Sequence, residues 1–384
     1  MNIMSAIDHR PTLAPCKATA CRFVASTAVL VAVLTTPAAA DDAMHRLAKV
    51  VGTTQANCKQ CHPSEVAHWE KTTHFRSLNR LQYAGNSKKY ADAMGIASST
   101  LMTTSLCADC HGTRALVDGA PQVVSGVSCE SCHGAARDWL KSHGEYTEGQ
   151  TFTTLSALRA ARSDEVAEHR VQRLESTRKA GMIRPEMLHE LARNCLQCHV
   201  VGNEQLIAAG HKVASNFELL SWLNGEVRHN FFEDAHTNAA APSLWQSTTG
   251  GTPEQRDRLK FVVGGMAQLE VALQKRAEAA SPVYVPQIGA YFAAANGRVT
   301  QVNALAGVSQ TQSMVARMGP LLGTMFVPMP TDRDTYGAAS IEIRELIDAY
   351  LAEHDGSDQA ALDALTKALP PHYSLQFKEQ FLEK

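Results

Sequence analysis

The second half of the chain carries apolar residues at the spacing of a helix with one buried face. They recur in steps of three and four residues: Leu259, Val262, Met266, Leu269 and Leu273. The sequence Thr-Pro-Glu-Gln at 252–255 lies just ahead of them. It has the form of a capping box with proline at the first helical position. The pattern therefore predicts a helix that begins here and buries this face.

Helical patterns also cover most of the remaining segments, so the expected fold class is mainly α. In the first half they cover residues 68–81, 163–179, 185–198 and 216–232. In the second half they cover residues 288–305, 341–353 and 359–369, after a proline-containing break at 281–286. The segment 112–126 is rich in glycine and only weakly periodic. We make no helix prediction for it.

The first forty residues have the features of a secretory signal peptide. Basic residues Arg10, Lys17 and Arg22 precede an apolar stretch at 23–34, and three alanines end at Ala40. The apolar stretch is shorter than the roughly 20 residues that a membrane-spanning helix needs. We therefore expect cleavage after residue 40 and export to the periplasm rather than an uncleaved anchor. No later stretch predicts a membrane span.

The charge balance of the chain argues against one class of partner. The 36 lysines and arginines are offset by 38 aspartates and glutamates, giving a formal net charge of −2. A protein that binds nucleic acid usually carries a strongly basic surface. We therefore expect no nucleic-acid partner.

The sequence Cys-x-x-Cys-His occurs four times in the first half of the chain. The eight cysteines are Cys58, Cys61, Cys107, Cys110, Cys129, Cys132, Cys195 and Cys198, and the histidines that follow are His62, His111, His133 and His199. This sequence is the attachment signature of haem c, in which both thiols bond to the porphyrin and the histidine becomes the proximal iron ligand. The other two of the ten cysteines lie in the leader. The spacing thus predicts four covalently bound haem c groups.

Cys-x-x-Cys pairs also occur in two other kinds of site. Zinc sites combine such pairs into four-thiolate clusters, and redox dithiols use one pair alone. Neither gives a reason for a histidine after every second cysteine. We therefore divide the chain into a signal peptide (1–40), a tetrahaem cytochrome c domain with a haem-centred core (41–245) and a C-terminal helical region (246–384).

Each iron needs a second axial ligand if its haem is to be six-coordinate. A second histidine gives a low-spin haem suited to electron transfer, whereas an open position lets a haem bind small molecules. The candidate distal ligands lie near a motif, at the end of an amphipathic segment or after small residues that allow a porphyrin to approach. They are His74, His143, His211, His229 and His189. The need of each iron for a second ligand does not by itself show which of these histidines belongs to which haem.

Three stretches of the haem region resemble the cytochrome c-554 family. They are the first motif with Trp69 and His74, the sequence 125–134 around the third motif with His143 downstream, and the fourth motif with His189 upstream. The resemblance implies a mainly α-helical fold with haems in close pairs, most of them ligated by two histidines and one five-coordinate. By position, His74, His143 and His189 match the family's distal ligands. Members of this kind accept electrons from hydroxylamine oxidoreductase.

The function expected from these observations is electron transfer between redox partner proteins in the periplasm. The alternative is a redox enzyme that acts on nitric oxide, nitrite or hydroxylamine at a five-coordinate haem. The sequence shows no other catalytic motif such as GxSxG, a P-loop or HExxH. For the C-terminal helices, the alternatives are simple packing on the haem core, or a surface for a homodimer or for docking to a larger oxidoreductase.

Overall fold

The computed structural model describes residues 46–52, 57–83, 85–103, 106–150, 152, 154–228 and 251–382. These residues are mainly helical, as the sequence predicted. The predicted signal peptide and His229 lie outside them. Within the described ranges, no helix combines the length and the apolar character needed to cross a bilayer.

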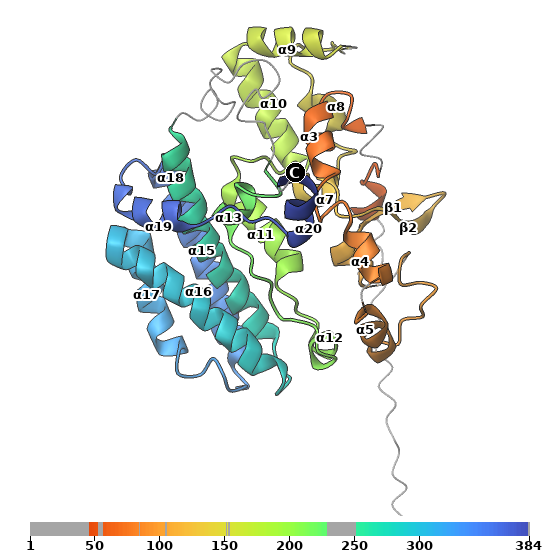
Figure 1. The fold of residues 1–384 in the computed structure, drawn as a ribbon. Coiled ribbons are helices and arrows are strands. Elements are labelled where there is room, and N and C mark those ends of the chain that lie inside the picture. The colour runs from red at the N-terminus through yellow and green to blue at the C-terminus, as the bar shows by residue number, and fades with distance from the viewer. Residues whose placement is uncertain are drawn as a thin grey trace, which may run out of the picture.

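The haem-motif half of the molecule is built from short helices (Figure 1). They are α3 (Pro63–Trp69), α4 (Ser77–Tyr83), α5 (Ser87–Ala93), α6 (Ala108–His111), α7 (Cys129–His133), α8 (Leu140–His143), α9 (Leu155–Asp164), α10 (Ala167–Lys179), α11 (Leu188–His199), α12 (Glu204–Ala208) and α13 (Leu219–Leu223). Short helices joined by turns can arrange many side chains around a cavity.

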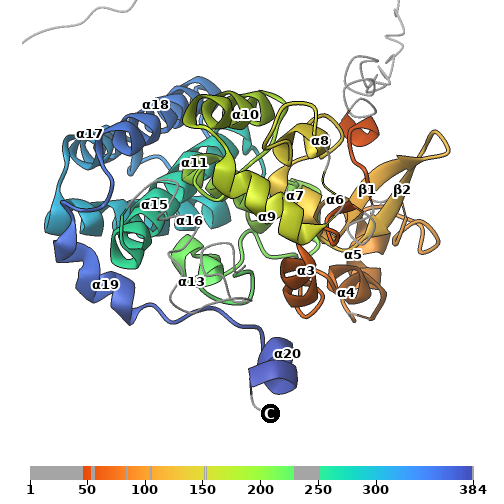
Figure 2. The ribbon, with the colours of Figure 1, turned by 90° about the horizontal axis from the view of Figure 1, so that it is seen from above.

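Longer helices make up the C-terminal part, which lies beside the haem-motif half (Figures 1 and 2). The long helices are α15 (Pro253–Glu278), α16 (Tyr284–Ala306) and α18 (Asp332–Glu353). The shorter elements are α17 (Ser309–Met318), η2 (Gly319–Leu321), η3 (Ala360–Leu362), α19 (Asp363–Ala368), α20 (Leu375–Phe377) and η4 (Lys378–Leu382). The C-terminal helices predicted from the sequence are confirmed, although α18 begins nine residues before the predicted start at 341.

Helix α15 is the central element of this part. Its first turn is closed by the predicted capping box, in which Thr252 and Gln255 bond each other's backbone N–H groups. The predicted apolar face is buried, and residues on the other faces are also largely buried because α15 packs against α18, α16, α11 and α13. Its main hydrophobic core includes Leu188 of α11 and Leu220 of α13. The C-terminal helices therefore pack directly on the helix that carries the fourth motif.

The glycine-rich segment forms a two-stranded antiparallel hairpin. Strands β1 (Thr113–Val117) and β2 (Ala120–Ser125) pair with Val117 opposite Ala120. The turn between them is Asp118-Gly119, with φ of 52° and 78°. Positive φ at both central residues is the geometry of a type I′ turn, which suits Asp-Gly. The weak alternation along these short strands explains why the pattern did not predict them.

Two of the helices expected in the first half are interrupted, in addition to a short break at residues 165 and 166 within the segment 163–179. The segment 68–81 is helical only up to Trp69 and again from Ser77. Between them the Thr72 hydroxyl accepts the N–H of Phe75 at 3.2 Å, and the Glu226 carboxylate accepts the N–H of Thr73. Side chains that bond backbone groups in this way compete with helical hydrogen bonds. The second, 216–232, is helical only over Leu219–Leu223, and its described part ends at residue 228.

Candidate haem-binding site

Each Cys-x-x-Cys-His sequence adopts a helical turn. The second motif ends α6, the third forms α7 and the fourth ends α11, while the first precedes α3 with His62 as its N-cap. In the first motif the N–H of His62 donates to the carbonyl of Cys58 at 2.9 Å. In the described chain all eight motif cysteines are free thiols rather than disulfides. They are therefore available for thioether bonds.

A cavity of about 1130 Å³ lies between these helices. Its wall includes motif residues and two predicted distal histidines: Cys110, His111, Cys129, Cys132, His133, Cys195, Cys198, His199, His74 and His211. Apolar side chains such as Trp69, Leu191, Phe217 and Trp222 complete much of the wall. A large apolar cavity with a few converging donor atoms is typical of a cofactor site.

Two pairs of imidazole rings lie close to one another, one pair with parallel rings and the other edge to face. The ring centroids of His74 and His199 are 6.2 Å apart, and those of His62 and His143 are 5.8 Å apart. Two metal–imidazole bonds of about 2 Å each fit within such a separation. His74 therefore lies opposite the histidine of the fourth motif, although it is nearer to the first in sequence. His143 lies opposite the histidine of the first.

A third pair is His111 with His211. Burial, and after it the neighbouring charge of His211, lower the pKa of His111 to about 4. The ring of Tyr90 packs 5.5 Å from the His211 ring. The Nδ1 of His211 donates to the Lys212 carbonyl at 2.8 Å, which leaves Nε2 for a metal.

The other imidazoles of the site are held in a similar way. The Nδ1 of His133 donates to the carbonyl of Ile183 at 2.8 Å, and the Nδ1 of His199 lies 2.6 Å from the Ser215 hydroxyl. Burial lowers the pKa of His143 to about 3 and that of His199 to about 4. A neutral imidazole is the form that binds a metal. These residues therefore fit the coordination chemistry of haem iron.

His189 has a different environment. Its Nε2 donates to the Glu270 carboxylate and its Nδ1 to the Asp348 carboxylate, both at 2.7 Å. Both ring nitrogens of His189 are thus hydrogen-bonded to residues of the C-terminal helices. His189 does not line the cavity. Its assignment as a distal ligand stays a prediction, as does that of His229.

The motifs are close enough to bring thiols of different motifs together. The thiol of Cys58 lies near that of Cys129, and the thiol of Cys110 lies near that of Cys198. Cys132 lies near Cys195, and burial raises the pKa of the Cys132 thiol to about 11. The attachment sites therefore follow one another in space in the order first, third, fourth and second.

Two residues at this site had no signal in the sequence. His372 stacks on Trp222 with ring centroids 4.3 Å apart, and Glu226 bonds the segment that carries His74. Both come from segments far from the motif that they approach. A glutamate in an amphipathic stretch and a histidine after two prolines have no local pattern that marks them.

Free paired thiols, a large apolar cavity and neighbouring neutral imidazoles are the features that a haem site of the c-type cytochrome class requires. Residues 57–134 match the family described as cytochrome c554 and c-prime. The resemblance to a cytochrome c-554-like family is thereby confirmed for the region of the first three motifs. The C-terminal helices lie outside the matched residues.

A curated relative supports the same family. Over 101 residues the chain is 25% identical to cytochrome c-554 of Nitrosomonas europaea, a match that covers 25% of this chain and 42% of that protein. The match thus spans less than half of the relative's length. No solved structure matches the chain.

Proposed function

We propose that this protein is a periplasmic tetrahaem c-type cytochrome that carries electrons between redox partner proteins. The observation that carries the proposal is that one cavity is lined by cysteines of three motifs, Cys110 and Cys198 among them together with Cys129. Haems fastened to such neighbouring thiols lie close to one another. When bound, haem c supplies one-electron redox chemistry at its iron.

The residues of the chain have three tasks in this proposal. The eight thiols fasten the porphyrins, and the motif histidines supply the proximal ligands. His143, His74 and His211 supply distal ligands opposite His62, His199 and His111. Apolar walls keep water from the cavity, which helps to set the reduction potentials. The third motif joins the first to the fourth, so that all four sites form one path.

Mass spectrometry and electron paramagnetic resonance test the proposal on protein made in a host that attaches haem c. The expected mass is that of the chain cleaved after residue 40 with four haems. The oxidised protein should show mainly low-spin ferric iron, and a redox partner should reduce it. A chain without haem, or one loaded with zinc at the motifs, would overturn the proposal. Carbon monoxide binding by the wild-type reduced protein would favour the enzyme alternative.

A further inference from the structure

The end of the chain returns to the haem-motif half of the molecule. Residues 370–382, which we call the C-terminal strap, leave the C-terminal helices after α19 and end in α20 and η4 (Figures 1 and 2). In both views α20 lies apart from α19 and near α3. The strap lies outside the residues that match the cytochrome c-554 family.

One part of the strap packs on the segment that carries Trp222. The N–H of His372 donates to the carbonyl of Ser221, and the N–H of Glu226 donates to the carbonyl of His372, both at 2.8 Å. A Cβ atom at Gly225 would lie only 2.1 Å from the His372 carbonyl oxygen, so glycine permits this approach. The strap is therefore bonded to the segment whose Trp222 ring lies 4.8 Å from that of His199.

Glu226 joins the strap to the segment that carries His74. One carboxylate oxygen accepts the N–H of Thr73 and the other accepts the N–H of Ser374 at 2.8 Å. The hydroxyl of Thr73 also donates to that of Ser374 at 2.8 Å. The carboxylate is almost completely buried, with 4% of the residue exposed. Removing it would leave two partly buried N–H groups without acceptors, which is costly.

The strap also holds the other side of His74. The Nη1 of Arg76 donates to the side-chain oxygen of Gln380 at 2.7 Å. Phe377 is buried, with its ring 5.9 Å from that of His68. Residues 73 and 76 are thus both bonded to the strap, and His74 lies between them. Because this segment is not helical, helical hydrogen bonds do not position the ring of His74.

We propose that Glu226 and the strap position His74 opposite His199, and that releasing them turns the haem of the fourth motif into a five-coordinate centre that binds a small neutral ligand such as carbon monoxide. The proposal rests on the proposed function, because it assigns a distal ligand to one of the four haems. Glu226 is a positioning residue, since it contacts the backbone beside His74 rather than the reacting atoms. Its loss exchanges one iron ligand for another and requires no electron transfer.

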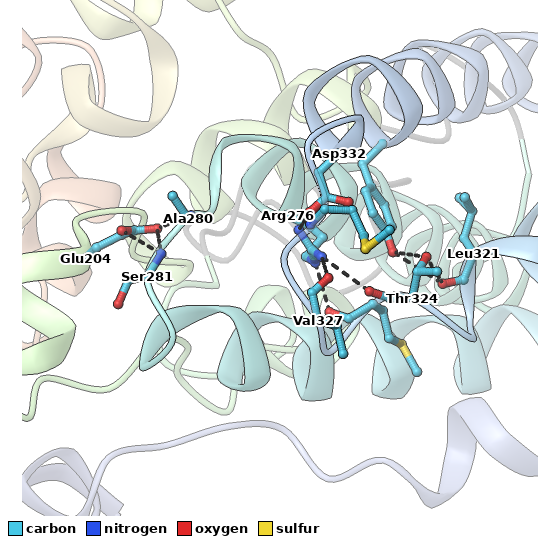
Figure 3. Close-up of polar contacts among 11 residues, drawn as sticks. Glu204, Arg276, Ala280, Ser281, Leu321, Thr324, Val327 and Asp332 are labelled. Carbon is cyan, nitrogen blue, oxygen red and sulfur yellow. Dashed lines mark hydrogen bonds and ion pairs between the residues drawn. The ribbon is translucent and has the colours of Figure 1, made fainter. Parts of the chain in front are cut away.

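Two substitutions test the joint between the strap and the segment that carries His74. E226Q keeps the shape of the side chain but replaces one of the two acceptor oxygens by a donor. Ser374→Pro removes the N–H that the carboxylate accepts, at a φ of −64° that proline adopts readily. E204Q is the matched control. Glu204 accepts the N–H groups of Ala280 and Ser281 at another joint between the two halves (Figure 3).

The readouts are haem content by mass spectrometry, the high-spin ferric signal and carbon monoxide binding after reduction. We expect E226Q and Ser374→Pro to keep four haems and to gain one carbon monoxide site per chain relative to wild type, while E204Q gains none. Haem-loaded variants that all keep the wild-type spin state and ligand binding would overturn the proposal. If E226Q does not accumulate, Ser374→Pro decides by itself. A wild-type protein without four haems would instead overturn the proposed function.

Discussion

His189 and Glu270 form a buried ion pair that joins the two halves of the molecule. Their Nε2 and Oε2 atoms are 2.7 Å apart, and the side chains are 5% and 0% exposed. Glu270 also accepts from Arg344 at 2.8 Å and lies 3.1 Å from the Nε of Arg193. His189 and Arg193 belong to α11, which ends in the fourth motif. The network therefore fixes the helix that carries that motif against the C-terminal helices.

The loss of stability on removing one member of this pair should depend on pH. Burial alone would lower the pKa of His189, but its hydrogen bonds to Glu270 and Asp348 raise it overall. The charged imidazole thus stabilises the fold fully below its unfolded pKa of about 6.5. That contribution is lost as pH rises through the raised folded pKa. We expect His189→Gln to cost about 1–3 kcal/mol in unfolding free energy at pH 6, since it removes one charged donor from a buried carboxylate that Arg344 and Arg193 still contact.

Denaturant unfolding of His189→Gln at pH 6 and at pH 9 should show a larger loss of unfolding free energy, relative to wild type, in the acidic sample. An equal loss at both pH values would contradict the ion-pair explanation.

The same substitution also tests whether His189 ligates a haem. If the haem spectrum of His189→Gln changes from low to high spin, the residue is a distal ligand in the loaded protein.

Arg276 should contribute strongly to stability without affecting the haems. Its guanidinium is fully buried and donates to the carbonyls of Met325 at 2.8 Å and Val327 at 2.7 Å, and to Asp332 at 2.7 Å (Figure 3). Arg276→Met leaves a buried carboxylate and several carbonyls unpaired, so we expect a loss of about 3–5 kcal/mol in unfolding free energy. Calorimetry would measure it. R317M, at an exposed ion pair, should change stability by less than about 1 kcal/mol.

His143→Ala should open one haem. The ring of His143 lies opposite that of His62, so its removal is expected to turn the haem of the first motif from low to high spin. Electron paramagnetic resonance of the oxidised protein would show one additional high-spin iron per chain. His169→Ala is the control, because His169 on the charged helix α10 bonds Glu165, the residue that follows α9. Identical spectra for both variants would contradict the assignment of His143.

Glu130 should determine how well the third motif is positioned. Its carboxylate accepts three backbone N–H groups, from Val51 at 2.9 Å and from Gly52 and Ala136 at 2.8 Å. Glu130→Gln cannot accept all three, so we expect a loss of about 1–3 kcal/mol in unfolding free energy. A lower yield of chains with four haems should accompany it. E175Q, in a helix-surface ion pair, should leave both quantities close to wild type.

The sequence by itself determined the attachment chemistry and the main helices. A Cys-x-x-Cys-His sequence needs only five consecutive residues, and the cap at Thr252 with its apolar stripe needs only one helix. Such features are local, so neighbouring residues encode them. The division of the chain at residue 245 and the signal peptide stay predictions.

Only the tertiary structure decided which histidines meet. It brought His74 to the fourth motif and paired His189 with Glu270. It also placed Glu226 and His372 at the site, which the sequence around these two residues does not predict. Each of these contacts joins segments far apart along the chain. Their geometry depends on how the helices pack and on which buried polar groups find partners, and no local pattern of residues records that.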